Sequence, residues 1–257
     1  MTEDELKQLV IAQLRQFGME AEPIPEQPDK KTADIKGSML GEVFLFELKQ
    51  RERVIEYVRD LETLAHGEIA EQIPELLKYR NNHSAVVRDG IKQLEATIDR
   101  GDEYRLLWLD AGEADPDLDA AQYEATLCGE RHLFCLGHST LFSCYFFTES
   151  EFFTNRAKLD GAVVSDGKGW KLLLNSYSPR YERLKSTEFV KKLGGAAWDP
   201  LEMEKQGRIL IADTDLDRRD EAAVLNYIFE KYGLQANVMP LRRYGAIIAI
   251  DPPKEDA

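Results

Sequence analysis

The amino-acid sequence predicts a mixed α/β (α+β) protein, with an αβββαβ core at residues 1–112 and an additional α+β domain at residues 123–257. Helix-like and strand-like hydrophobic patterns follow one another in the first part. An acidic stretch with glycine and proline, residues 111–122, predicts a linker. Beyond it, phenylalanine, tyrosine and cysteine concentrate in hairpin-like segments, which indicates a change of architecture.

The first part begins with a helix over residues 3–17, because Leu6, Val10 and Leu14 recur at helical spacing and Gly18 is a stop signal. The elements expected after it are an extended stretch at 20–25, a strand at 32–36, a turn at 37–41, a strand at 42–50, a helical pattern at 53–80 broken near Pro74, a helix at 85–100 and a buried strand at 104–110. This order is that of a mixed α/β domain of ordinary size.

The second part is expected to contain two hairpins, because short apolar runs flank glycine-containing turns. The first hairpin covers residues 133–147, and the second joins 162–165 to 170–174 through the turn DGKG. The remaining expected elements are a helix ending at Gly194, a strand at 208–212, a helix at 220–232 and strands near 236–241 and 244–250.

The charge and hydropathy of the chain limit the functions that it can have. A net charge of −14 counts against the broad basic surface that gives nucleic-acid-binding proteins their non-specific affinity, so any such surface has to be local. No apolar run approaches the roughly 20 residues of a membrane span, and the acidic N-terminus is unlike a secretion signal, so we expect a cytoplasmic protein. The candidate basic patches are Lys30, Lys31, Lys36, Lys49, Arg51 and Arg53, and then Arg180, Arg183, Lys185, Lys191 and Lys192.

The three cysteines do not predict a disulfide framework, because their number is odd and they lie far apart. Cys128, His132, Cys135 and His138 lie within eleven residues and raise the alternative of a zinc site. On a strand, however, Cys135 faces away from His132 and His138, and nearby glycines disfavour a helix that would gather these side chains. The spacing is therefore weak support for zinc.

The strand expected at 42–50 carries a charged pair near its end. Glu47 and Lys49 share a face with Val43 and Leu45, whereas the opposite face is apolar. Burying these two charges is costly unless they pair or bind something. Asp34 belongs to the preceding strand, and the twelve residues between it and Glu47 are enough for a hairpin that brings the two carboxylates together.

Two adjacent carboxylates repel each other, and a divalent cation relieves that repulsion. Hard oxygen ligands suit Mg²⁺ or Mn²⁺, which bind through one or two carboxylates together with a substrate phosphate. Such an ion polarises a phosphoryl oxygen and makes a bound water more acidic, while Lys49 can hold that water or offset transition-state charge. These residue types therefore indicate hydrolysis of phosphodiester bonds.

Asp34 followed by Glu47-Leu48-Lys49 on an apolar strand resembles the PD-(D/E)XK, or restriction-endonuclease-like, nuclease superfamily, over roughly residues 3–110. The resemblance implies that Asp34 and Glu47 bind Mg²⁺ or Mn²⁺, that the Leu48 carbonyl is a further ligand, and that Lys49 is the catalytic lysine. A Pro-Asp pair is also found at Pro28-Asp29, but we favour Asp34 because TADIKG is strand-like whereas PDKK is turn-like.

The same resemblance implies supporting residues on two helices. For an acidic residue on the first helix, Glu5 is our choice and Glu3 the substitute, and Lys92 or Gln93 is the expected polar residue on the second core helix. The activity that it implies is that of a metal-dependent deoxyribonuclease, with a role in restriction or defence.

Two other functions stay open. The protein can be a non-catalytic nuclease-fold protein that binds nucleic acid or a protein partner, or an interaction module in which Glu47 and Lys49 form an incidental ion pair. The second part can serve substrate recognition, partner binding or homodimer formation. Within it, arginines interleaved with an aromatic residue suit phosphate contact and base stacking, and the candidate nucleic-acid-binding residues are Arg180, Tyr181 and Arg183.

Overall fold

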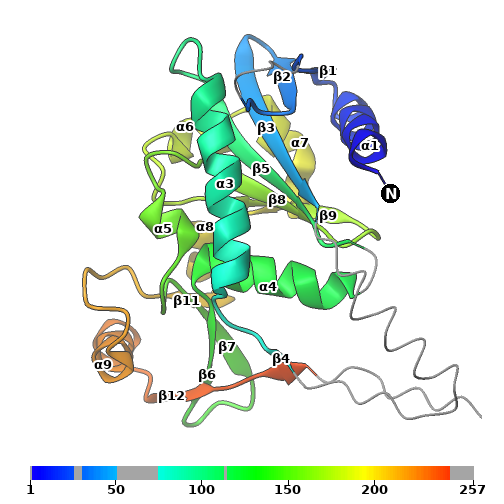
Figure 1. Ribbon diagram of the computed structural model, residues 1–257. Helices are drawn as coiled ribbons and strands as arrows, with labels where there is room; N and C mark the ends of the chain where they lie inside the picture. Colours follow the sequence, from blue (N-terminus) through cyan, green and yellow to red (C-terminus); the bar gives the residue numbers. More distant parts are fainter. Residues whose placement is uncertain (1, 26–30, 51–74, 113–114, 244–257) are drawn as a thin grey trace, which may run out of the picture.

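The computed structural model describes residues 2–25, 31–50, 75–112 and 115–243 (Figure 1). The helices of these residues are α1 (Glu3–Gln16), α3 (Asn81–Thr97), α4 (Pro116–Cys128), α5 (Glu151–Thr154), α6 (Tyr181–Lys185), α7 (Glu188–Leu193), the 3₁₀ helix η1 (Gly194–Ala196), α8 (Pro200–Lys205) and α9 (Glu221–Tyr232). The strands are β1 (Glu20–Pro23), β2 (Ile35–Met39), β3 (Glu42–Gln50), β4 (Glu75–Leu76), β5 (Tyr104–Asp110), β6 (Arg131–Cys135), β7 (Leu141–Tyr145), β8 (Gly161–Ser165), β9 (Trp170–Leu174), β10 (Ala197–Trp198), β11 (Ile209–Ile211), β12 (Ala236–Met239) and β13 (Arg242–Arg243).

Seven strands of the described residues form one sheet in the order β1-β2-β3-β5-β8-β9-β10. β1, β2 and β3 are antiparallel neighbours, whereas β3 pairs in parallel with β5 and β5 in parallel with β8. An antiparallel β8–β9 hairpin then leads to the short parallel edge strand β10. The presence of both kinds of pairing in one sheet confirms the mixed α/β (α+β) class.

Side chains that alternate across this sheet build two separate cores. On one face, Phe44, Phe46 and Trp108 meet the buried sides of α1 and α7. On the other face, Leu45 and Leu107 meet α3 and α4. Figure 1 shows α3 crossing the strands on one side of the sheet, with α7 on the far side. β3, which carries Glu47, is therefore packed from both sides.

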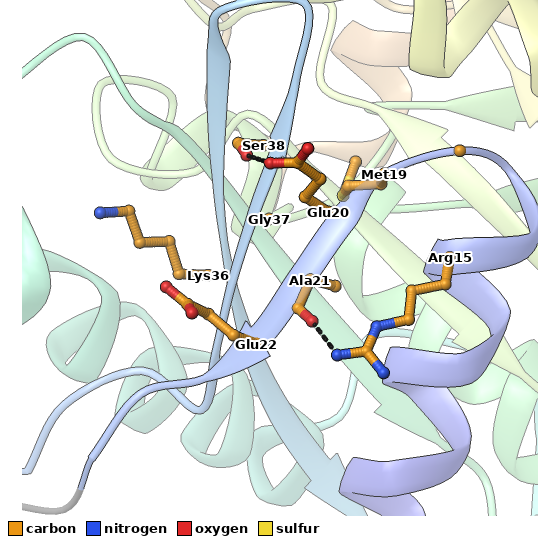
Figure 2. A pocket seen from close by; sticks show the side chains of 9 residues that line it. Arg15, Met19, Glu20, Ala21, Glu22, Lys36, Gly37 and Ser38 are labelled. Carbon is orange, nitrogen blue, oxygen red and sulfur yellow. Dashed lines mark hydrogen bonds between the residues drawn. The ribbon is translucent and has the colours of Figure 1, made fainter.

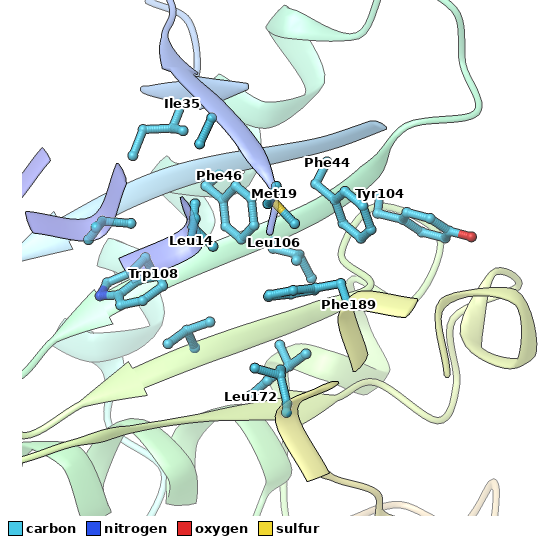
Figure 3. Packing of buried hydrophobic residues seen from close by; sticks show 14 of the residues in the cluster. Leu14, Met19, Ile35, Phe44, Phe46, Tyr104, Leu106, Trp108, Leu172 and Phe189 are labelled. Carbon is cyan, nitrogen blue, oxygen red and sulfur yellow. The ribbon is translucent and has the colours of Figure 1, made fainter. Parts of the chain in front are cut away.

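Aromatic side chains fill the core between the sheet, α1 and α7 (Figure 3). The ring centroid of Phe44 lies 5.0 Å from that of Tyr104 and 5.4 Å from that of Phe189. Such ring pairs contribute about 0.5–1.5 kcal/mol beyond the burial of apolar area. Because Phe189 belongs to α7, residues late in the chain stabilise strands near the N-terminus.

The helix predicted at 3–17 is confirmed as α1, and its N-terminus is capped by its own side chains. The Glu5 amide donates to Thr2 Oγ1 at 3.3 Å, and the Thr2 amide donates to Glu5 Oε2 at 2.7 Å. This reciprocal capping box satisfies two of the amide groups that a helix start leaves without partners. At the other end, Gly18 turns the chain with a φ of 84°.

β2 and β3 form a tight hairpin through Leu40 and Gly41, whose φ values are 50° and 85°. Two left-handed residues in succession match the twist of paired strands, so the connection needs no further residues. The strand predicted at 32–36 lies instead at Ile35–Met39, because its pairing with β3 continues through the segment predicted as a turn.

The chain beyond α4 adds a second sheet, with the order β11-β7-β6-β12 in the described residues. Val224 and Ile228 of α9 pack on one face of it, where they meet the free, buried thiols of Cys135 and Cys144. The predicted hairpins, helices and strands of this part are confirmed in β6–β7, β8–β9, α7, β11, α9 and β12.

The linker prediction for residues 111–122 is wrong. Pro116–Cys128 forms α4, and its side chains Tyr123 and Leu127 are buried in the core beneath α3. Acidic residues that suggested a linker belong to the first turn of this helix, where Asp115 is the N-cap and the helix dipole favours negative charge. The sheet does not divide here either, because β5 pairs with β8 across the expected boundary between residues 1–112 and 123–257.

Residues 75–80 do not continue the helix predicted for 53–80, because Glu75–Leu76 forms β4 and pairs with β13. The rest of that helix (53–74), the strand near 244–250 and the alternative ligand Asp29 lie outside the described residues. None of the helices in the described ranges is both long and apolar enough to cross a membrane.

Candidate functional site

The structure brings Asp34 and Glu47 together across the β2–β3 hairpin. The register pairs Ile35 with Phe46, and the Asp34 amide donates to the Phe46 carbonyl at 3.0 Å. In turn, the Leu48 amide donates to Asp34 Oδ2 at 2.9 Å. The Asp34 carboxylate is therefore tied directly to the backbone of the strand that carries Glu47.

Glu47 is a carboxyl group held almost out of water, with 1% of the residue exposed. Its Oε1 lies 2.9 Å from Lys49 Nζ, whereas no donor in the described residues reaches Oε2. Burial, followed by the nearby charge of Asp34, raises the pKa of Glu47 to about 8. Glu47 thus has a buried carboxyl oxygen that no donor group of the described residues reaches, which is costly unless another group binds there.

Lys49 is held between two carboxylates from different elements. Its Nζ contacts Glu47 Oε1 at 2.9 Å and Asp89 Oδ2 of α3 at 3.2 Å. Burial alone lowers the pKa of Lys49, but its contacts with Glu47 and Asp89 outweigh burial and raise that pKa. Lys49 is therefore a positioned cation at neutral pH, next to the carboxylate pair.

Lys7 of α1 is a second cation of this site, and sequence reasoning missed it. Its Nζ lies 3.0 Å from Asp34 Oδ1, and the two side chains are only 11% and 13% exposed. The helical spacing of the sequence does indicate a buried position, since Lys7 lies one helical turn before Ile11 and two before Leu14 on the buried stripe of α1. A lysine on such a stripe has to bring its charge to a partner at the core boundary.

α3 lies close to the site because it has a glycine where it crosses β3. A Cβ atom added to Gly90 would lie 2.6 Å from Leu107 Cδ2 and 3.2 Å from Glu47 Cγ. The neighbouring Asp89 is thereby brought to Lys49, and Gln93 Nε2 donates to Asp89 Oδ2 at 3.2 Å. Sequence reasoning named Gln93 but missed Asp89 and Gly90.

The other expected site residues are placed as follows. Glu5 is engaged in the capping box of α1, and Lys7 is the residue of that helix that reaches Asp34. Lys92 is exposed on α3, whereas Gln93, the other expected polar residue, joins the cluster through its hydrogen bond to Asp89. The side chain of Leu48 is buried in the α1–α7 core while its amide contacts Asp34.

The expected nucleic-acid-binding residues of the second part make contacts within the protein. Arg180 Nε donates to both Asp160 carboxylate oxygens at 3.0 Å, and Arg183 Nε donates to the Tyr104 hydroxyl at 2.8 Å. Tyr181 is 4% exposed, so its ring is buried and not available to stack on a base, and that part of the prediction is wrong. The reason is packing, since α6 closes the α1–α7 core with this ring.

A pocket of about 590 Å³ lies elsewhere, beside the edge strand β1 (Figure 2). Arg15 donates to the Ala21 carbonyl at 2.8 Å at its border, and Lys36 and Glu22 extend their charged groups along β2 and β1. The residues that line it do not include Asp34, Glu47 or Lys49, so this pocket is distinct from the carboxylate site.

The residues of the carboxylate site fit a hard divalent cation. Two adjacent carboxylates and a buried oxygen without a donor are the chemistry that Mg²⁺ or Mn²⁺ satisfies with few protein ligands. Within the described ranges, no group of three or more His, Cys, Asp and Glu side chains is arranged to hold a metal ion. Any ion here therefore relies on Asp34, Glu47 and oxygens from the backbone or from a substrate.

Comparisons with known proteins give no relative: no protein-family model, curated protein or solved structure matches this chain.

Proposed function

We propose that this protein is a Mg²⁺- or Mn²⁺-dependent nuclease that hydrolyses DNA phosphodiester bonds, with a restriction-endonuclease-like core and a role in restriction or defence. The observation that carries the proposal is the juxtaposition of Asp34, a Glu47 carboxylate with an oxygen that no described donor reaches, and a Lys49 ammonium 2.9 Å from that carboxylate. The order of α1, β1, β2, β3, α3 and β5 supports it, because it is the order expected of such a core.

In this proposal each residue has a separate task. Asp34 and Glu47, together with the Leu48 carbonyl, hold the ion, which when bound supplies Lewis acidity at the phosphate. Lys49 donates hydrogen bonds to the attacking water or to the charged transition state. Asp89 keeps the Lys49 ammonium in place and charged through its 3.2 Å contact.

The decisive experiment is cleavage of supercoiled plasmid in Mg²⁺ or Mn²⁺ by the wild type and by Glu47→Gln. We expect the variant to lose at least about 100-fold of the rate, as when a stabilising group of a transition state is removed. Glu42→Gln makes the same chemical change at the opposite end of β3 and serves as the matched control. Equal cleavage by wild type and Glu47→Gln contradicts the assignment.

A second candidate function, a nuclease-fold protein that binds without cutting, is favoured by one observation. Lys7 and Lys49 already contact Asp34 and Glu47 in the absence of an ion. Such a protein could bind either nucleic acid or a protein partner. DNA affinity measured at several salt concentrations distinguishes these two cases, because binding through phosphate contacts predicts a steep loss of affinity with salt. Absence of DNA binding points to a homodimer or to a protein partner, and the net charge of −14 favours the protein partner.

A further inference from the structure

Lys7 occupies the carboxylate oxygen that a bound cation needs. Asp34 Oδ2 accepts the backbone amide of Leu48, and this bond joins the side chain to the sheet. Asp34 Oδ1 is therefore the oxygen left to share an ion with Glu47 Oε2, which no donor of the described chain reaches. The Lys7 ammonium lies 3.0 Å from that same Oδ1.

An ammonium group and a divalent ion cannot both hold this oxygen. Two cations in contact with one atom repel each other strongly, and water screens that repulsion little where the side chains of Lys7 and Asp34 are 11% and 13% exposed. Lys49 does not create the same conflict, because it contacts the other oxygen of Glu47 and is drawn toward Asp89 on α3.

We infer that Lys7 is an internal competitor for the metal ion: its ammonium holds Asp34 until a divalent cation displaces it, and it thereby sets the affinity of the site for that cation. This inference rests on the metal site of the proposed function. The Lys7–Asp34 ion pair stabilises the metal-free protein. Because a bound ion has to break this pair, the free energy of metal binding is reduced by the same amount. A lysine side chain can move its ammonium group while its stem stays packed on the helix.

The test is Mn²⁺ binding by the metal-free full-length protein, measured by calorimetry and by electron paramagnetic resonance. We expect Lys7→Gln to bind Mn²⁺ between about 5- and 150-fold more tightly than the wild type, the usual range for coupled sites. Lys36→Gln removes the same charge from an exposed position two residues after Asp34, and we expect it to change the affinity far less. Should Lys7→Gln fail to fold, Lys7→Met keeps the apolar stem and gives the same comparison.

The possible results distinguish a failure of the competitor role of Lys7 from a failure of the proposed metal site. Tighter binding in Lys7→Gln that is abolished by adding Glu47→Gln supports the inference and locates the ion. If the wild type binds Mn²⁺ and Lys7→Gln binds it equally or more weakly, the competitor role is overturned and the metal site stands. If neither protein binds Mn²⁺, both the inference and the metal site are overturned.

Discussion

Glu47 combines two properties that conflict in a folded protein, a titratable carboxyl group and a position shielded from water. Its pKa is raised to about 8 because burial and the charge of Asp34 both oppose ionisation. Lys49 offsets part of this cost by its contact with Oε1 of Glu47. No described donor reaches Oε2, so the cost of burying that oxygen remains. Such a residue gains most from a bound cation, and it also leaves a signature in the stability of the protein.

That signature is a dependence of stability on pH. The pKa of Glu47 is about 8 in the folded protein and 4.5 in the unfolded chain. The contribution of protonated Glu47 to folding stability is therefore full below pH 4.5 and is lost as the pH rises from 4.5 to about 8. The loss amounts to at most about 1.4 kcal/mol per pH unit. Urea denaturation of metal-free protein across this window should show the wild type losing stability relative to Glu47→Gln. Parallel curves for the two proteins contradict the raised pKa.

Asp34, Glu47 and Lys49 could be named from the sequence because strand alternation and hairpin spacing are local rules. Asp89 could not be found in this way, and for Lys7 the buried stripe of α1 indicates a buried charge but not the partner that it reaches. Both lie on helices, and which helical side chain reaches the site depends on how α1 and α3 are rotated and placed against the sheet. That placement follows from packing across long sequence separations, which a local pattern does not contain.

Among the helices, α1 and α3 serve the site in different ways. α1 contributes Lys7 from its buried side, whereas its first turn is engaged in capping itself through Thr2 and Glu5. α3 contributes Asp89 and approaches β3 closely at Gly90. Each arrangement can be tested by one substitution, and for Glu5 on α1 the expected result differs from what the nuclease resemblance implies.

Glu5→Ala tests the role of the first helix. We expect a loss of about 1 kcal/mol in unfolding free energy, because the capping box is broken, and an unchanged cleavage rate per folded molecule. Denaturation and plasmid cleavage on the same preparation measure both. A collapse of cleavage with intact folding would restore Glu5 as an acidic residue of the site. Asp34→Asn is the companion variant that should abolish cleavage.

Gly90→Ala tests the close approach of α3. Alanine favours a helix over glycine by about 1 kcal/mol, but the new methyl group meets Leu107 and Glu47, and overpacking costs about 1–3 kcal/mol. We expect a net loss of about 1 kcal/mol in a urea denaturation experiment. Ala85→Gly on the exposed side of α3 measures the helix preference alone and is the control. A variant more stable than the wild type would show that α3 can move away from β3 at no cost.

At the scale of the whole molecule, one sheet joins the two parts that the sequence suggested were separate. Most of the longer strands were predictable because each carries its own apolar pattern, whereas the two-residue strands β4 and β10 were not predicted. The pairing of β5 with β8 was not, because a fully buried parallel strand has no local feature that selects its neighbour. Phe189 of α7 crosses the same boundary when it packs on Phe44 and Phe46.

A fragment of residues 1–112 therefore should not fold by itself. It exposes one edge of β5 and removes α7 from the aromatic core, so both hydrogen bonds and buried area are lost. We expect a poorly dispersed NMR spectrum for the fragment and a dispersed one for the full chain. A dispersed spectrum from the fragment would establish residues 1–112 as an autonomous domain.

The late position of Phe189 also bears on how the protein is made. A chain leaves the ribosome from its N-terminus at about 5–20 residues per second, so β3 emerges on the order of ten seconds before α7. During that interval Phe44 and Phe46 lack the ring that covers them. We therefore expect the carboxylates of the hairpin to reach their final geometry only when most of the polypeptide has been translated.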